Sequence, residues 1–267
     1  MDNTDRYKQT LSAKGFTVID DVYNTDEIAA ILAEIDRANS DKTTFRKTGD
    51  LFAIRQFLKE IPAINSIIFN HKLKAVISDL LGDDYFVVKS IYFDKPERSN
   101  WFVAWHQDLT ISVDKKVELP GYGPWTVKQN QFAVQPPLNI LQNNFTIRIH
   151  LDNADEGNGA LKVIPGSHLK EIYRPETINW DIETETTCIV KAGGIMIMRP
   201  LLLHASNRTT NNKPRKVIHI EFSSVSLPYG MEWSEKQVFM SSEAWVYKAT
   251  FFSPLSTPLI NFIKPAM

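Results

Sequence analysis

The sequence of 267 residues lacks features that mark several classes of protein. Its one cysteine, Cys188, allows neither an intramolecular disulfide nor a metal cluster held by cysteines. No apolar run approaches the roughly 20 residues that cross a bilayer, and residues 1–10 are polar, without the apolar region of a secretory signal. We therefore expect a soluble, cytoplasmic protein, because a reducing compartment suits a chain without disulfides.

The sequence also lacks an excess of either charge, since 30 basic residues stand against 31 acidic ones. The basic clusters, Lys115-Lys116 and residues 213–216, are short and typical of solvated loops. Neither a nucleic acid nor a membrane surface is therefore indicated as a partner. Nothing in the composition indicates an oligomeric state.

The order of the elements predicts helices first and many short strands afterwards. A β-prone run at 15–20 precedes a helix that begins near Asn24, where cap residues stand before apolar residues at helical spacing. A second helical region spans about 57–81 and ends at the turn signal of Gly82. The β-prone runs that follow lie at 85–93, 102–105, 145–151, 161–164, 187–190, 195–198 and 217–222.

This order is typical of a mainly β fold with flanking helices, a jelly roll or cupin-like barrel with a helical layer packed outside. We expect one domain over residues 1–267. Its expected parts are a helical N-terminal layer over about 1–84, a jelly-roll core over about 85–225 and a C-terminal extension over about 226–267.

The segment 114–144 has weak periodicity and is either a lid over a pocket or an extra pair of strands. It contains Tyr122, Trp125 and Phe132, aromatic residues that would shape a pocket beneath a lid. Trp125 is therefore a candidate for contact with a substrate.

The sequence Trp105-His106-Gln107-Asp108 places a histidine and a carboxylate two residues apart. On a strand, such residues point to the same face, so both side chains would reach one metal ion. A further histidine from a neighbouring strand would complete a facial set of two imidazoles and one carboxylate, which suits Fe(II) and leaves coordination positions open. Zinc hydrolases use similar ligands, so the ligand types alone do not select iron.

The second histidine ligand must come from the other five histidines, which are His71, His150, His168, His204 and His219. His71 lies in a helical segment and His168 in a turn, while His150 and His219 lie inside β-prone runs where a core histidine is the ordinary case. His204 follows an apolar run and precedes Ala205-Ser206, which favours it modestly as the ligand.

These motifs, in this order, resemble the phytanoyl-CoA dioxygenase family of Fe(II)/2-oxoglutarate-dependent oxygenases. Residues 15–19 are similar to the family's N-terminal entry, and His106-Gln107-Asp108 to its His-x-Asp element. Residues 158–168 resemble its characteristic strand and turn. The distal histidine is matched by His204, and the family's arginine by Arg215, eleven positions later. The order and the last spacing are more specific than any single motif.

The resemblance implies a double-stranded β-helix in which His106, Asp108 and His204 bind iron. It implies that Arg215, helped by the hydroxyl of Ser206, pairs with the distal carboxylate of 2-oxoglutarate. An arginine suits this role because its planar fork binds a carboxylate in two places and stays charged.

The resemblance also offers two weaker assignments and a reaction. Gln107 would help to order the co-substrate, and Lys89 is either a polar co-substrate contact or a salt-bridged surface lysine. The implied reaction consumes O2 and 2-oxoglutarate, releases succinate and carbon dioxide, and hydroxylates a small-molecule substrate. Relatives that halogenate have a small residue at the position of Asp108, so this aspartate favours hydroxylation or a related desaturation or cyclisation.

The run 145–152 alternates strictly and places Arg148 on the same face as Asp152. If that face lines the barrel, Arg148 either binds an anionic group of the substrate or forms an internal salt bridge with Asp152 or Glu221. Two rival functions remain open: a different metalloenzyme on a cupin-like barrel, such as an isomerase or hydrolase, and a non-catalytic barrel that binds a small ligand.

Overall fold

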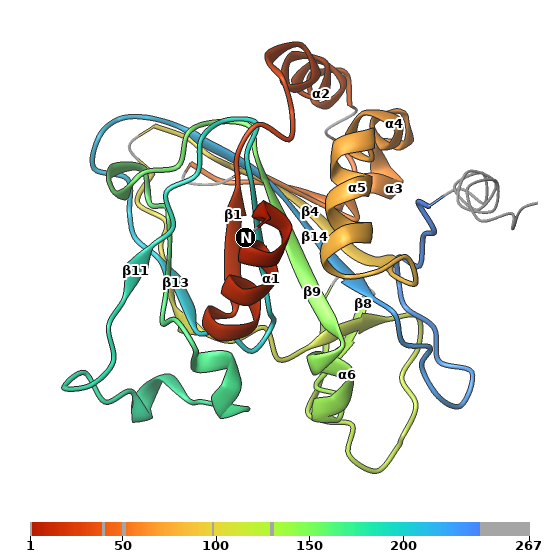
Figure 1. The fold of residues 1–267 in the computed structure, drawn as a ribbon. Helices are drawn as coiled ribbons and strands as arrows, with labels where there is room; N and C mark the ends of the chain where they lie inside the picture. The colour runs from red at the N-terminus through yellow and green to blue at the C-terminus, as the bar shows by residue number, and fades with distance from the viewer. Residues whose placement is uncertain (1, 39–40, 50–51, 98, 129–130, 241–267) are drawn as a thin grey trace, which may run out of the picture.

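The computed structural model describes residues 2–38, 41–49, 52–97, 99–128 and 131–240 (Figure 1). From residue 241 onward, the expected C-terminal extension lies outside the described residues. Its described part joins the barrel, because Trp233 forms an isolated β-bridge with Val113, and Gln237 forms one with Val87.

Antiparallel sheets dominate the described fold, as the sequence predicts. The main sheet has seven strands in the order β1-β12-β9-β14-β4-β3-β2, and a second sheet has four in the order β11-β10-β13-β5. A third sheet has three strands in the order β6-β8-β7. The main sheet consists of β1 (Phe16–Ile19), β2 (Phe45–Lys47), β3 (Phe52–Arg55), β4 (Phe86–Lys95), β9 (Asn144–His150), β12 (Ile195–Met198) and β14 (Arg215–Ser223). The smaller sheets consist of β5 (Val103–His106), β6 (Ile111–Val113), β7 (Trp125–Lys128), β8 (Gln131–Val134), β10 (Leu161–Val163), β11 (Thr186–Thr187) and β13 (His204–Ser206).

The helices of the first 84 residues cover one face of the main sheet (Figure 1). The α-helices are α1 (Asn3–Lys14), α2 (Thr25–Arg37), α3 (Phe57–Glu60), α4 (Asn65–Ile68), α5 (His71–Leu80) and α6 (Leu138–Gln142). The 3-10 helices are η1 (Pro62–Ile64), η2 (Glu156–Asn158), η3 (Ser167–Lys170) and η4 (Pro175–Thr177). In the described part of the chain, no helix has the length and apolar character to cross a membrane.

Local sequence accounts for some of these elements and not for others. The predicted start of α2 is confirmed, because Asn24 and Glu27 form a reciprocal capping box there. Nothing in the pattern predicts α1, which is largely polar and buries only Leu11. Strands β2 and β3 also lie in the segment expected as a helical layer, and at three and four residues they are too short to show a period.

The two faces of the main sheet differ in chemistry because side chains alternate along each strand. On β9, Ile147 and Ile149 point to the helices and belong to the main apolar core. The alternate residues Thr146, Arg148 and His150 are buried on the opposite, inner face. This inner face meets the second sheet, since Arg215 of β14 contacts Ser206 of β13. A buried face with so many polar groups indicates a binding site rather than a sealed core.

The segment 114–144 contributes strands and not only a loop, since β7 and β8 pair with each other and β8 pairs with β6. Trp125 and Phe132 pack with buried Val134 and Leu141 in an apolar cluster. Thr126 and Ala133, which alternate with them, line a cavity instead. The open choice between a lid and extra strands is thus decided in favour of strands.

We expect Ile147→Ala to lower the free energy of unfolding by about 2–5 kcal/mol, because it leaves a void in the central strand of the core. The matched control is Ile189→Ala, at a side chain that is 65% exposed, which we expect to cost about 0.5 kcal/mol or less. Urea denaturation measures both values. Equal losses in the two variants would contradict the proposed core.

Candidate metal centre

The backbone brings together the three residues that the resemblance assigns to iron. His106 ends β5 and His204 begins β13, and the two are directly paired in the antiparallel register. Asp108 follows two residues after β5, where its backbone N–H donates to the carbonyl of Pro200 at 2.9 Å. One ligand atom from each of the three side chains lies within 4.8 Å of the other two. A single ion can therefore touch all three.

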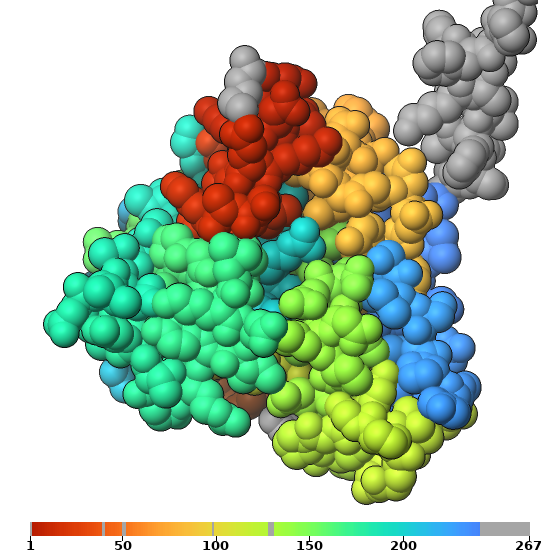
Figure 2. All heavy atoms as spheres, turned by 60° about the horizontal axis from the view of Figure 1, so that its bottom comes forward, coloured from red at the N-terminus to blue at the C-terminus, as the bar shows by residue number. Residues whose placement is uncertain are grey.

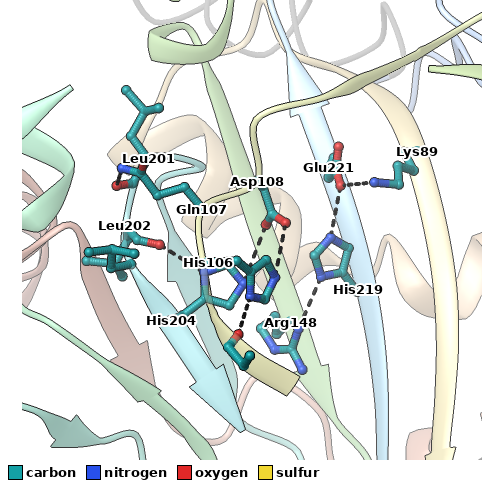
Figure 3. A network of polar contacts seen from close by, with 12 residues as sticks. Lys89, His106, Gln107, Asp108, Arg148, Leu201, Leu202, His204, His219 and Glu221 are labelled. Carbon is teal, nitrogen blue, oxygen red and sulfur yellow. Dashed lines mark hydrogen bonds and ion pairs between the residues drawn. The ribbon is translucent and has the colours of Figure 1, made fainter. Parts of the chain in front are cut away.

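Hydrogen bonds to the backbone orient both imidazoles. Nδ1 of His106 lies 2.8 Å from the carbonyl of Ala104, and Nδ1 of His204 lies 2.9 Å from that of Leu202. Since a carbonyl only accepts, each Nδ1 carries the proton and each Nε2 is left with its lone pair free for a metal. The two Nε2 atoms lie 3.9 and 3.8 Å from the carboxylate oxygens of Asp108 (Figure 3).

The Asp108 carboxylate also fits a metal, because its Oδ2 is buried without a hydrogen-bond partner among the described residues. Burial acts to raise the pKa of Asp108, but nearby His204, His219, Lys89 and His106 outweigh it and lower the pKa to about 2. Burial lowers the pKa of His204 to about 4, so this imidazole stays neutral near pH 7. A charged carboxylate and a neutral imidazole are the states in which these groups bind metals.

Arg215 lies at one end of the inner face of β14 and is 4% exposed. One of its terminal nitrogens donates to Oγ of Ser206 at 3.3 Å, and its Nε has no partner among the described residues. Burial, and then the charge of Arg148, lower the pKa of Arg215 to about 9. No carboxylate pairs with this guanidinium in the described part of the chain, so the site lacks the anion that would offset its burial.

Lys95 is a basic residue of this site that the sequence did not single out. It lies directly opposite Arg215 in the register of β4 and β14, and it is 1% exposed. Its ammonium donates to the carbonyl of Asn207. Burial, and then the charge of Arg215, lower the pKa of Lys95 to about 8. Nothing near Lys95 in the sequence indicates that it lies beside Arg215, because the β4–β14 register pairs residues 120 positions apart.

A chain of polar contacts crosses the inner face from Lys89 to Arg148 (Figure 3). Lys89 pairs with Glu221 at 2.6 Å, Glu221 contacts Nε2 of His219 at 3.1 Å, and Nδ1 of His219 contacts Arg148 at 3.2 Å. Because an arginine N–H only donates, Nδ1 of His219 accepts and its Nε2 donates to Glu221. Glu221 thus reaches Arg148 only through His219, and Asp152 pairs with Lys216 instead. Neither expected salt bridge of Arg148 forms, and its buried Nε has no partner among the described residues.

Three predicted residues remain, and each has other contacts in the structure: Gln107, Lys89 and Trp125. The Gln107 amide donates to the carbonyls of Leu201 and Glu171 at 2.5 and 2.8 Å, and its oxygen accepts from the N–H of Tyr173 at 2.8 Å. Its polar groups are therefore used in fixing loops beside the metal ligands. Lys89 is a salt-bridged but mostly buried lysine, six positions along β4 from Lys95. The Trp125 ring packs in an apolar cluster.

Comparison with known proteins agrees with this geometry. A sequence model of the family described as phytanoyl-CoA dioxygenase matches residues 11–217. The chain is 22% identical to a probable alpha-ketoglutarate-dependent hypophosphite dioxygenase from Stutzerimonas stutzeri, over 92% of this chain and 88% of that protein. It is 21% identical to an ectoine dioxygenase from Bordetella parapertussis, over 81% and 74% of the two chains.

Among solved structures, EctD from S. alaskensis with 2-oxoglutarate and 5-hydroxyectoine matches with a TM-score of 0.63 and 19% identity. The match covers 82% of this chain and 75% of that one. At this level of identity the likeness shows the fold, and the predicted jelly roll is confirmed.

We expect His106→Ala and His204→Ala each to weaken Fe(II) binding by at least about 100-fold, because each removes one of the three proposed ligands. Titration of the purified protein with Fe(II) under nitrogen measures the affinity. The matched control is His168→Ala, at a histidine whose Nε2 contacts the carbonyl of Ser12 outside the site. If all three variants bound Fe(II) like the parent, the metal would lie elsewhere.

Proposed function

Because the chain belongs to the phytanoyl-CoA dioxygenase family, it is an Fe(II)/2-oxoglutarate-dependent oxygenase, and we propose that it hydroxylates a C–H bond of a small polar molecule. Succinate and carbon dioxide are the products of the co-substrate. The observation that carries the proposal is the convergence of His106, Asp108 and His204 within 4.8 Å, next to a buried arginine without a carboxylate partner among the described residues.

In this proposal, iron is held by His106 and His204 at the ends of strands in the second sheet, and by Asp108 in the loop that follows β5. The iron, when bound, supplies the activation of O2 that a protein side chain cannot provide. The chain contributes position and protonation state: the two carbonyls behind the imidazoles fix their orientation, and the loop pinned by Gln107 fixes Asp108 and Leu201.

Arg215 and Ser206 would bind the distal carboxylate of 2-oxoglutarate, as the family resemblance implies. Support comes from the free Nε of Arg215 and from the 3.3 Å contact between its other nitrogen and the Ser206 hydroxyl. Lys95 adds a second positive charge beside this carboxylate. We assign Lys89 to the substrate side of the iron instead, because its ammonium already pairs with Glu221, far along the strand from Arg215.

We propose that Arg148 faces the metal from the opposite sheet and binds an anionic group of a molecule held there. Its position beside the metal ligands in Figure 3 and its unpaired Nε support this role. Two of the relatives carry names of small polar compounds, hypophosphite and ectoine, and neither is a long acyl thioester. Trp125 stays a prediction as a substrate contact. Its ring packs in an apolar cluster, and its neighbour Thr126 lines the cavity instead.

We further propose that the protein works in the cytoplasm. Its single thiol, Cys188, is buried, and burial raises its pKa to about 12, so it stays protonated and unreactive. The whole described chain would act as one oxygenase domain.

We expect Arg215→Ala to lower kcat/KM for 2-oxoglutarate by about 100-fold, the equivalent of losing one charged pair worth about 3 kcal/mol. Iron binding should persist, because Arg215 is not among the proposed ligands. Succinate formation by the iron-loaded protein measures the effect. The control is Lys213→Ala, which removes a positive charge two residues before Arg215, at a side chain that is itself 67% exposed.

This experiment also separates the rival functions. An isomerase or hydrolase on the same barrel has no need of Arg215, so unchanged activity in Arg215→Ala would favour it. A barrel that only binds a ligand would form no succinate at all, with or without the substitution.

A further inference from the structure

A cavity of about 200 Å³ lies between the main sheet and the third sheet. Its walls are mostly polar and come from four parts of the chain: β3 and the residue after it, β4, the β6–β8 strands and the segment after β14. The residues that matter for its chemistry are Arg55, Lys89, Thr110, Ser112, Gln131 and Glu235. In Figure 2 the yellow-green segment, which carries β7 and β8, lies against the blue segment that follows β14, and both segments supply walls of this cavity.

The cavity lies at the opposite end of β14 from Arg215. Arg215, His219 and Glu221 share the inner face of β14, and about 20 Å of strand separates the first from the last at roughly 3.4 Å per residue. Arg215 marks the proposed co-substrate end, whereas Glu221 pairs with Lys89 in the cavity wall. Thr110, also in the wall, follows Asp108 by two residues. A molecule in the cavity would thus approach the iron from the side that the co-substrate leaves open.

Arg55 places an unused positive charge in this wall. It ends β3 and pairs with Ile91 of β4 in the sheet. Its guanidinium has no hydrogen-bond or ion-pair partner among the described residues, whereas the charge of Lys89 is taken up by Glu221. Arg55 is therefore the cation of the cavity that is available to a bound anion.

Glu235 places an unused acceptor in the same cavity. It is 2% exposed, and its Oε2 accepts a hydrogen bond of 2.5 Å from the hydroxyl of Ser90. Its Oε1 is buried and has no partner in the described part of the chain. A buried carboxyl oxygen without a partner costs free energy until a donor reaches it. Burial raises the pKa of Glu235 to about 7, and a bound cation or N–H donor would favour its charged form.

We propose that this cavity is the site of the primary substrate, and that it selects a small zwitterion with an anionic group at Arg55 and a protonated amine at Glu235. The proposal rests on the proposed oxygenase function and names its substrate class. The volume, about 200 Å³, lies below the range of roughly 300–1,000 Å³ that holds drug-sized ligands, which favours a small molecule over a long acyl chain. The short polar side chains of Thr110, Ser112 and Gln131 offer hydrogen bonds around the middle of such a molecule.

The test is a substrate panel on the iron-loaded, full-length protein with 2-oxoglutarate. The panel consists of the common L-amino acids, with their carboxamides and their N-acetyl derivatives, and octanoyl-CoA as a long thioester. Stimulated succinate formation is the readout, and calorimetry under nitrogen measures binding independently. We expect at least one free amino acid to stimulate, and its carboxamide and N-acetyl derivative to fall at least tenfold in kcat/KM.

Two variants assign the two ends of the substrate. Arg55→Gln should abolish the preference for the carboxylate over the carboxamide and keep the preference for the free amine. Glu235→Gln should do the reverse, so each variant is the control of the other. Arg46→Gln, at an exposed arginine on the neighbouring strand β2, should change neither preference.

The outcomes distinguish failure of the zwitterion proposal from failure of the proposed oxygenase function. If the protein forms succinate but no free amino acid stimulates it, or if the carboxamides, the N-acetyl derivatives or octanoyl-CoA stimulate equally, the zwitterion proposal is overturned and the oxygenase function stands. If Arg55→Gln and Glu235→Gln leave both preferences intact, the cavity is not the substrate site. If no iron-dependent succinate forms under any condition, the proposed function itself fails.

Discussion

Buried positive charge without a matching carboxylate is the constraint around which this site is built. Arg148 and Arg215 are 8% and 4% exposed on the inner face of the main sheet, and neither is ion-paired within the described residues. A charge that is buried and unpaired costs several kcal/mol. The fold tolerates the cost because the apolar face of the same strands packs against the helices, and because a bound anion removes it. Doubly charged 2-oxoglutarate is such an anion, and its distal carboxylate would offset the charge of Arg215.

The strand register distributes the parts of this site along one axis. Arg215 and Lys95 stand opposite each other at one end, His219 and Arg148 in the middle, and Glu221 and Lys89 at the other end. The metal ligands come from the second sheet, which contacts this row through Ser206 and Arg215. The proposed co-substrate site, metal centre and substrate cavity therefore follow one another along the barrel, so that two ligands would reach the iron from different sides.

The sequence alone allowed part of this site to be predicted. His106 and Asp108 are close in the chain, and His204 and Arg215 follow at a spacing that resembles the family, so these four residues could be predicted from the sequence. The fold class followed from the order of helices and β-prone runs. Arg55, Lys95 and Glu235 could not be found in this way, because each acquires its role from a strand pairing or a burial that spans much of the chain. The packing of Trp125 could not be foreseen either: its ring lies in an apolar cluster, while its small polar neighbour Thr126 lines the cavity.

The charge balance of the inner face is tested most directly by binding of 2-oxoglutarate and of its distal amide, 2-oxoglutaramate, to the iron-loaded protein under nitrogen. The two compounds have the same size and the same metal-binding end, and they differ by the one charge assigned to Arg215 and Ser206. The account predicts one site per chain and an affinity for 2-oxoglutarate at least about tenfold higher, which corresponds to roughly 1.4 kcal/mol. Equal affinities for the two compounds would contradict it.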